Sequence, residues 1–242
     1  MPAPMLPIAI PSTYFTNGQR ATLPERMASA TPDMMAAIHK ITSALEALGG
    51  HLYLSDLFRS YEMQRQSHLD WKNGKKTAFS PPPGGSLHEA GRALDLDLKA
   101  LGMELADFWP IAKEHGLSPI IKAPTPDVNE AWHFDCRGSH DLVYEHYKSG
   151  KGTNFKKPYE AMAASAILSI GVKVDKFGAK QTEASIQSAL IRLGHDVGNI
   201  DGGLGQKTKA ILEQIGVPFS DAPTMLTALE EKLRAVFPGE FE

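Results

Sequence analysis

The chain has 242 residues, of which 42% are hydrophobic and 22% are charged, and its formal net charge is −3 at pH 7. This length and apolar content suffice for one large or two modest globular domains. The nearly balanced charge, without a run of like charges, argues against a nucleic-acid partner or an anionic membrane surface. A single cysteine, Cys136, excludes an intramolecular disulfide and a cysteine cluster for zinc, so a metal ion would need His, Asp or Glu ligands.

The N-terminal segment 1–25 is predicted to be an extended arm. It lacks a basic opening, and its prolines interrupt the apolar stretch before it reaches the length of a signal peptide. No apolar run in the chain approaches the roughly 20 residues that a membrane-spanning helix needs. We therefore expect no membrane insertion.

Residues 26–150 carry alternating helix and strand signals. Apolar residues at helical spacing predict a helix over 34–50, which ends at two glycines, and Ser60 is a candidate N-cap for a helix over 61–72. Further helices are predicted over 105–116, where Pro110 allows a kink, and over 140–148. Strands are predicted over 51–58, 92–98, 117–122 and 131–136. The pattern indicates an α+β domain.

Residues 151–242 differ from residues 26–150 in their sequence pattern. Residues 151–160 have the polar, lysine-containing composition of a linker, and beyond them the strand signals disappear. Helices are predicted over 159–170, 182–194, 205–216 and 224–237. We therefore expect a small all-α domain over 161–242.

The stretch "SLHEAGRALDLD" over 86–97 places a histidine and carboxylates at fixed intervals. Strand alternation puts Asp95 and Asp97 on one face and the leucines on the other, toward the core. His88 precedes Asp95 by seven residues, and Gly91 between them permits the turn that would bring both side chains to one point. A catalytic zinc site usually has three protein ligands, so a third must come from elsewhere.

The stretch "NEAWHFD" over 129–135 offers that ligand. His133 lies three residues after Glu130, so one of them can bind a metal ion while the other accepts a proton from the bound water. Trp132 would help to keep such a site dry. Taken singly, these residues are explained as well by a loop histidine, solvated carboxylates or a core tryptophan. Their combination is what favours a metal site.

The pattern "SxHxxGxAxD" followed by "ExWH" resembles the zinc D-alanyl-D-alanine carboxypeptidases and dipeptidases of the VanY and VanX type, with related phage endolysins. An upstream "RSxxxQ" element is present as "RSYEMQ" over 59–64, and the resemblance covers roughly residues 30–150. It implies a catalytic domain over 26–150 with a central antiparallel sheet flanked by helices.

The resemblance also implies roles for single residues. It makes Glu130 the general base, and it makes Arg59 the group that stabilises the oxyanion. It implies that one zinc ion is bound by His88, Asp95 and His133. Substrate contacts are expected from Ser86, Gln64 and Trp132.

The implied activity is zinc-dependent hydrolysis of peptidoglycan stem peptides. The "ExWH" motif favours the D-alanyl-D-alanine bond, while the internal L-alanyl-D-glutamate bond of the endolysins stays an alternative. A second alternative is a cell-wall-binding protein without activity, against which the presence of Glu130 argues.

The C-terminal segments "LIRLG" and "DGGLGQKT" resemble the three-helix peptidoglycan-binding domain. The "FQ" ending of that family is missing, so a purely structural helical cap stays open. The resemblances imply peptidoglycan as the partner, with no obligate protein partner. They also imply action at the bacterial cell wall or periplasm, and the lack of a visible signal peptide is compatible with a phage-encoded enzyme released through a membrane pore.

Overall fold

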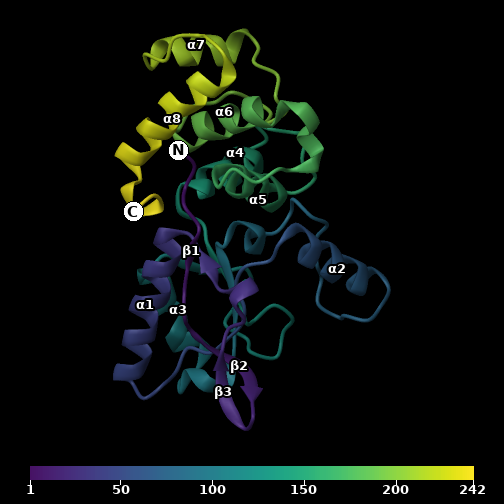
Figure 1. Cartoon of the computed structure of the whole chain (residues 1–242), viewed down its shortest axis with the longest axis vertical. Coiled ribbons are helices and arrows are strands. Elements are labelled where there is room, and N and C mark those ends of the chain that lie inside the picture. Colours follow the sequence, from purple (N-terminus) through teal and green to yellow (C-terminus); the bar gives the residue numbers. More distant parts are fainter. The chain divides into compact units, whose positions relative to one another are not determined.

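The computed structural model describes all 242 residues and shows a mixed α+β fold (Figure 1). Its contacts divide the chain into two compact units, which we describe separately. The sheet unit consists of Met5–Pro81 and Leu87–Gly138, and the helical unit consists of Met1–Pro4, Pro82–Ser86 and Ser139–Glu242. None of the helices combines the length and the apolar character that crossing a bilayer requires.

The sheet unit is built on a six-stranded mixed sheet of order β3-β2-β5-β6-β8-β7. Its strands are β2 (Pro11–Thr16), β3 (Gln19–Thr22), β5 (Leu54–Asp56), β6 (Ala93–Leu96), β7 (Leu117–Pro119) and β8 (His133–Cys136). The two-residue strands β1 (Leu6–Pro7) and β4 (Ser29–Ala30) form a separate pair. All pairs in the six-stranded sheet are antiparallel except β2 with β5, so the expected antiparallel sheet is mixed at this one position.

The N-terminal segment, expected to be an extended arm, supplies β1, β2 and β3. A two-residue turn at Asn17 and Gly18 joins β2 to β3, and both residues have positive φ angles, 51° and 79°. Such a turn matches the twist of the flanking strands, and an Asn-Gly pair adopts it readily. The segment is extended because it pairs with its neighbours in the sheet.

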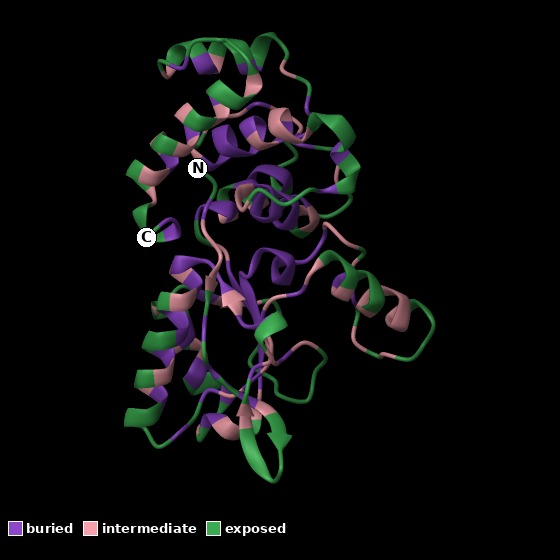
Figure 2. Cartoon of the chain, in the orientation of Figure 1, coloured by how far each residue is buried: buried purple, intermediate pink, exposed green.

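Three helices and three short 3-10 turns complete the sheet unit. They are α1 (Pro32–Ala47), α2 (Tyr61–Lys72), α3 (Leu105–Glu114), η1 (Glu25–Met27), η2 (Leu87–Ala90) and η3 (Leu98–Leu101). The predicted cap at Ser60 is confirmed, because its side chain accepts a hydrogen bond from the amide of Met63. In the core, Phe108 of α3 meets Phe134 of β8 edge to face at a centroid distance of 5.2 Å. Figure 2 shows the resulting pattern on α1, buried along one side and exposed on the other.

A buried ion pair connects α1 to the centre of the sheet. Arg92, directly before β6, is fully buried, and its guanidinium donates to both carboxylate oxygens of Asp33 in α1. Its Nε also donates to the backbone carbonyl of Cys136 at 3.0 Å. Cys136 itself is buried in the core, as strand alternation predicts. This network fixes the starts of α1 and β6 and the end of β8 relative to one another.

The helical unit contains five α-helices. They are α4 (Asp141–Lys148), α5 (Pro158–Ser169), α6 (Gln181–Arg192), α7 (Gln206–Gln214) and α8 (Ala222–Val236), with 3-10 turns η4 (Gly138–His140), η5 (Asp175–Lys180) and η6 (Pro238–Glu240). Near the C-terminus, the buried carboxylate of Glu240 accepts hydrogen bonds from the amide of Ser139 at 2.6 Å and from Arg192 at 2.6 Å. These bonds connect η6 to η4, which directly precedes α4, and to the end of α6.

The units divide at Ser139 and not within the expected linker 151–160. The reason is that α4, expected to belong to the catalytic domain, packs against α5 and α6. The expected linker is itself held in place: the Tyr147 hydroxyl donates to Asn154, and Gly152 lies so close to the Tyr147 ring that a Cβ there would be 2.5 Å from it. Residues 151–160 therefore belong to the packed helical unit.

Candidate metal centre

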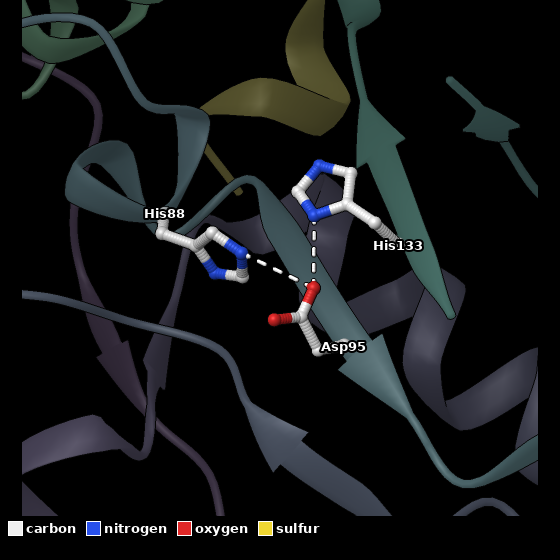
Figure 3. A group of neighbouring side chains, drawn as sticks. All are labelled: His88, Asp95 and His133. Carbon is white, nitrogen blue, oxygen red and sulfur yellow. Dashed lines mark hydrogen bonds and ion pairs between the residues drawn. The ribbon is translucent and has the colours of Figure 1, made fainter. Parts of the chain in front are cut away.

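The structure brings His88, Asp95 and His133 together in the sheet unit. One potential ligand atom from each lies within 4.8 Å of the other two, and all three side chains are buried or nearly so (Figure 3). Asp95 on β6 pairs directly with His133 on the neighbouring antiparallel strand β8, while His88 comes from the 3-10 turn η2 that precedes β6. The sheet register and one short turn thus assemble the group.

The hydrogen bonds of His88 define which of its nitrogens is available. Its Nδ1 lies 2.7 Å from the backbone carbonyl of Leu57, which can only accept, so Nδ1 carries the proton. In the neutral ring, Nε2 then has a lone pair, and this atom is buried without a hydrogen-bond partner, 3.4 Å from Oδ1 of Asp95. A lone pair that is buried without a hydrogen-bond donor is unfavourable, and a metal ion would accept it.

His133 is oriented from its other side by a carboxylate that the sequence analysis missed. Its Nε2 lies 2.9 Å from Oδ1 of Asp135, and its Nδ1 lies 2.8 Å from Oδ1 of Asp95. Asp135 is two residues after His133 in the same strand and so points to the same face, a signal that the alternation of "HFD" already contained. A carboxylate on the distal nitrogen is the usual partner of a metal-binding histidine.

The charges of the two histidines and of Asp95 affect one another. Burial alone would raise the pKa of Asp95, but His88 and His133 outweigh burial and hold that pKa well below its ordinary value. Burial lowers the pKa of His133, yet the hydrogen bonds that its ring donates to Asp135 and Asp95, and the negative charges of these carboxylates, raise it to about 10. Without a metal ion, a proton therefore lies between Nδ1 of His133 and Asp95, where a cation is favoured.

These observations fit a divalent metal ion. Two imidazole nitrogens and one carboxylate oxygen converge, the Nε2 of His88 has no other partner, and the donors are the types that zinc prefers. Three protein ligands are also the number found in catalytic zinc sites. His88, Asp95 and His133 could therefore hold a metal ion.

Arg59 lies beside this group, at the junction between β5 and α2. Its Nε donates to Asp56 at 2.6 Å, one terminal nitrogen donates to Gln64 at 3.2 Å, and the other donates to Oδ2 of Asp95 at 3.4 Å. The side chain of Gln64 is fully buried. Its amide therefore holds the guanidinium of Arg59 against the candidate ligand Asp95.

Glu130 occupies an unusual backbone conformation in the loop before β8. Its φ angle is 69°, in the left-handed region that an L residue with a long side chain rarely adopts. Its Oε1 is buried without a hydrogen-bond partner, and burial raises the pKa of its carboxyl group, with His133 opposing the rise and Asp95 adding to it. Strain and a perturbed pKa at one residue are typical of functional sites.

The remaining predicted residues lie as follows. Trp132 is half-buried, and its carbonyl accepts a hydrogen bond from the amide of Leu96 at 3.1 Å. Ser86 is buried and belongs to the helical unit. Asp97 lies beyond the end of β6, where its side chain caps η3 by accepting from the amide of Lys99 at 3.0 Å. The substrate contacts expected of Ser86, Gln64 and Trp132 stay predictions.

Comparison with solved structures finds similar folds over about half of the chain. The LdcB LD-carboxypeptidase, whose structure is described as revealing the molecular basis of peptidoglycan recognition, is 17% identical with a TM-score of 0.39; the alignment covers 54% of this chain and 66% of that one, slightly less than two thirds. The L,D-carboxypeptidase DacB from Streptococcus pneumoniae is 19% identical with a TM-score of 0.35, over 55% of this chain and 84% of that one. No protein-family model and no curated protein sequence matches the chain.

Proposed function

We propose that the chain is a zinc-dependent peptidase that hydrolyses the D-alanyl-D-alanine bond of peptidoglycan stem peptides. The observation that carries the proposal is the convergence of His88 Nε2 and His133 Nδ1 on one oxygen of Asp95, with the buried His88 nitrogen left without a partner. The choice of bond is supported by the "ExWH" motif that ends at His133.

In this proposal His88, Asp95 and His133 hold the zinc ion, which when bound lowers the pKa of water and polarises the substrate carbonyl. Glu130 accepts the proton of the attacking water and returns it to the leaving amine. The raised pKa of its carboxyl group and its unpartnered Oε1 suit a group that takes up and releases a proton during the reaction.

Arg59 supplies positive charge where the carbonyl oxygen becomes negative. The hydrogen bonds that its guanidinium donates to Asp56 and Gln64 fix it before substrate arrives, so little reorganisation is needed during the reaction. We expect Arg59→Ala to lower turnover by a factor of about 10²–10³ while zinc stays bound. In this proposal Gln64 acts through Arg59, and Ser86 and Trp132 contact the peptide.

We propose further that the helical unit keeps the enzyme close to peptidoglycan at the bacterial cell wall or periplasm. The basis is the "LIRLG" and "DGGLGQKT" pattern at the end of α6 and the start of α7. Sedimentation of the full chain with insoluble peptidoglycan tests this part, and equal amounts of protein in the supernatant with and without peptidoglycan would contradict it.

Mass spectrometry of stem peptides tests the enzyme itself. Pentapeptide and tetrapeptide muropeptides are incubated with the zinc-loaded full chain, with Glu130→Gln, and with Asp97→Asn as a matched carboxylate control outside the metal group. We expect loss of one D-alanine from the pentapeptide with the wild type and Asp97→Asn, and none with Glu130→Gln.

Other products would change the proposal in defined ways. Loss of D-alanine from the tetrapeptide would assign an L,D bond, and release of the stem after L-alanine would assign the endolysin-type reaction. No product from either peptide, with zinc shown to be bound, would overturn the peptidase proposal and favour a binding protein.

A further inference from the structure

A chain of hydrogen bonds leads away from Arg59 to a lysine in the loop after α2. Gln64, which accepts from Arg59, donates through its side-chain nitrogen to the hydroxyl of Ser80 at 3.1 Å. Ser80 donates to the hydroxyl of Ser67 at 3.0 Å, and Lys76 Nζ donates to the same Ser67 oxygen at 3.1 Å. Gln64 and Ser80 are both almost completely buried. The ammonium group of Lys76 is therefore connected to the candidate metal centre through fixed side chains.

The loop that carries Lys76 is also fixed to α2, which with this loop extends to one side of the sheet unit (Figure 1). Nδ1 of His68 lies 2.8 Å from the carbonyl of Ser80, and the ring of Phe79 packs edge to face on Trp71 at a centroid distance of 4.8 Å. The amide of Lys76 donates to the carbonyl of Asp70 at 3.2 Å. Little conformational freedom would thus be lost when an anion binds there.

The charge of Lys76 has no anionic partner at contact distance. Its side chain is half-buried, no carboxylate lies within 4.0 Å of Nζ, and its one hydrogen bond goes to a neutral hydroxyl. An ammonium group has three donors, and partial burial without a counter-ion is unfavourable. Lys76 is also within electrostatic reach of the proposed base, because its charge opposes the rise that burial causes in the pKa of Glu130.

The guanidinium of Arg59 donates to Asp56, Gln64 and Asp95, and in the proposed function its charge faces the reacting carbonyl oxygen, so Arg59 is not assigned to a second anion. Lys76 is then the cation near Glu130 whose charge is available to an additional anion. A carboxypeptidase substrate carries such an anion one residue beyond the bond that is cut, namely its terminal carboxylate.

We propose that Lys76 binds the free C-terminal carboxylate of the substrate peptide and thereby restricts the enzyme to the terminal peptide bond. The inference rests on the proposed function and deepens it, because it assigns the substrate class as peptides that end in a free carboxylate. Lys76 binds the leaving residue and takes no direct part in proton transfer, so its loss raises KM for the acid far more than it changes kcat.

A matched pair of peptides tests the subsite. The zinc-loaded full chain is assayed with a stem pentapeptide that ends in a free carboxylate and with the same peptide ending in a carboxamide. We expect the wild type to prefer the acid by about 10- to 100-fold in KM, which is the range of a hydrogen bond to a charged group. Lys76→Met should abolish this preference by raising KM for the acid alone, and Lys76→Arg should retain most of it.

Lys75→Met serves as the control, because Lys75 is exposed and adjacent in sequence. Calorimetric binding of both peptides to Glu130→Gln, with and without Lys76→Met, measures the preference without turnover.

Equal weakening of acid and amide by Lys76→Met would overturn the inference and show that Lys76 acts through Glu130 or through the loop. A wild type that cleaves or binds both peptides equally would also overturn it while leaving the proposed function intact. Failure of the wild type to cleave either peptide, with the acid still bound more tightly, would overturn the proposed function alone.

Discussion

Replacing Asp135 isolates the contribution of a carboxylate that contacts the candidate metal ligands without being one of them. Its Oδ1 accepts a hydrogen bond from Nε2 of His133 at 2.9 Å, and Asp135 is itself buried. In Asp135→Ala the imidazole loses the partner that fixes its orientation and increases its basicity. Loss of such a partner weakens metal binding by about 10- to 100-fold, which corresponds to about 1.4–2.8 kcal/mol.

Zinc affinity, measured by competition with a chromophoric chelator at constant pH, gives the value directly. Asp97→Asn is the matched control, because Asp97 follows β6, the strand that pairs with β8, but caps η3 and should leave zinc affinity unchanged. Asp135→Asn should fall between the wild type and Asp135→Ala, since its amide oxygen still accepts but carries no charge. A zinc dissociation constant that is the same in Asp135→Ala and the wild type would refute the reasoning.

Three further outcomes are expected. Glu130→Asn should relieve the strain of the left-handed conformation and raise the free energy of unfolding by about 1 kcal/mol in urea titrations while abolishing hydrolysis; unchanged stability would count against strain. In the metal-free protein the raised pKa of His133 stabilises the fold fully below its unfolded value of 6.5, and this stabilisation is lost as pH rises toward about 10; unfolding free energies across this range should decline, and His133→Gln should flatten the decline. Arg92→Met leaves the carboxylate of Asp33 without its buried partner and should cost about 3–5 kcal/mol in the same titrations, and a loss below about 1 kcal/mol would contradict the buried ion pair.

Much of the sheet unit follows from local sequence signals. The helix after Ser60 begins where the capping rule places it, and the "RALDLDL" alternation locates β6 with Asp95 facing His133. The candidate ligands could be predicted because their residue types and spacing are restrictive. Asp135 was missed because an acidic residue in a strand has no distinctive spacing of its own, although its position two residues after His133 was available.

Other features depend on contacts that a local pattern does not contain. The β2–β3 hairpin is rich in polar residues, so only an extended arm was predicted there, and the parallel pairing of β2 with β5 depends on long-range packing. A fully buried Arg92 runs against the preference of arginine for the surface, and it is explained by the positions of Asp33 and of the Cys136 carbonyl, which accept its hydrogen bonds. The division at Ser139 reflects the packing of α4 on α5 and α6 and not the composition of the segment that follows.

The order of the strands in the sheet has a consequence for synthesis of the chain on the ribosome. The β2–β3 hairpin is complete once Thr22 has emerged, but β6 lies between β5 and β8, and β8 is made last of the three. Until β8 has been synthesised, Asp95 has no contact with His133, and the backbone groups of β6 that pair with β8 have no hydrogen-bond partners in the sheet. A nascent chain stalled before His133 should therefore be the form most exposed to chaperone binding and proteolysis, and the candidate metal centre should be able to hold an ion only after translation has passed β8.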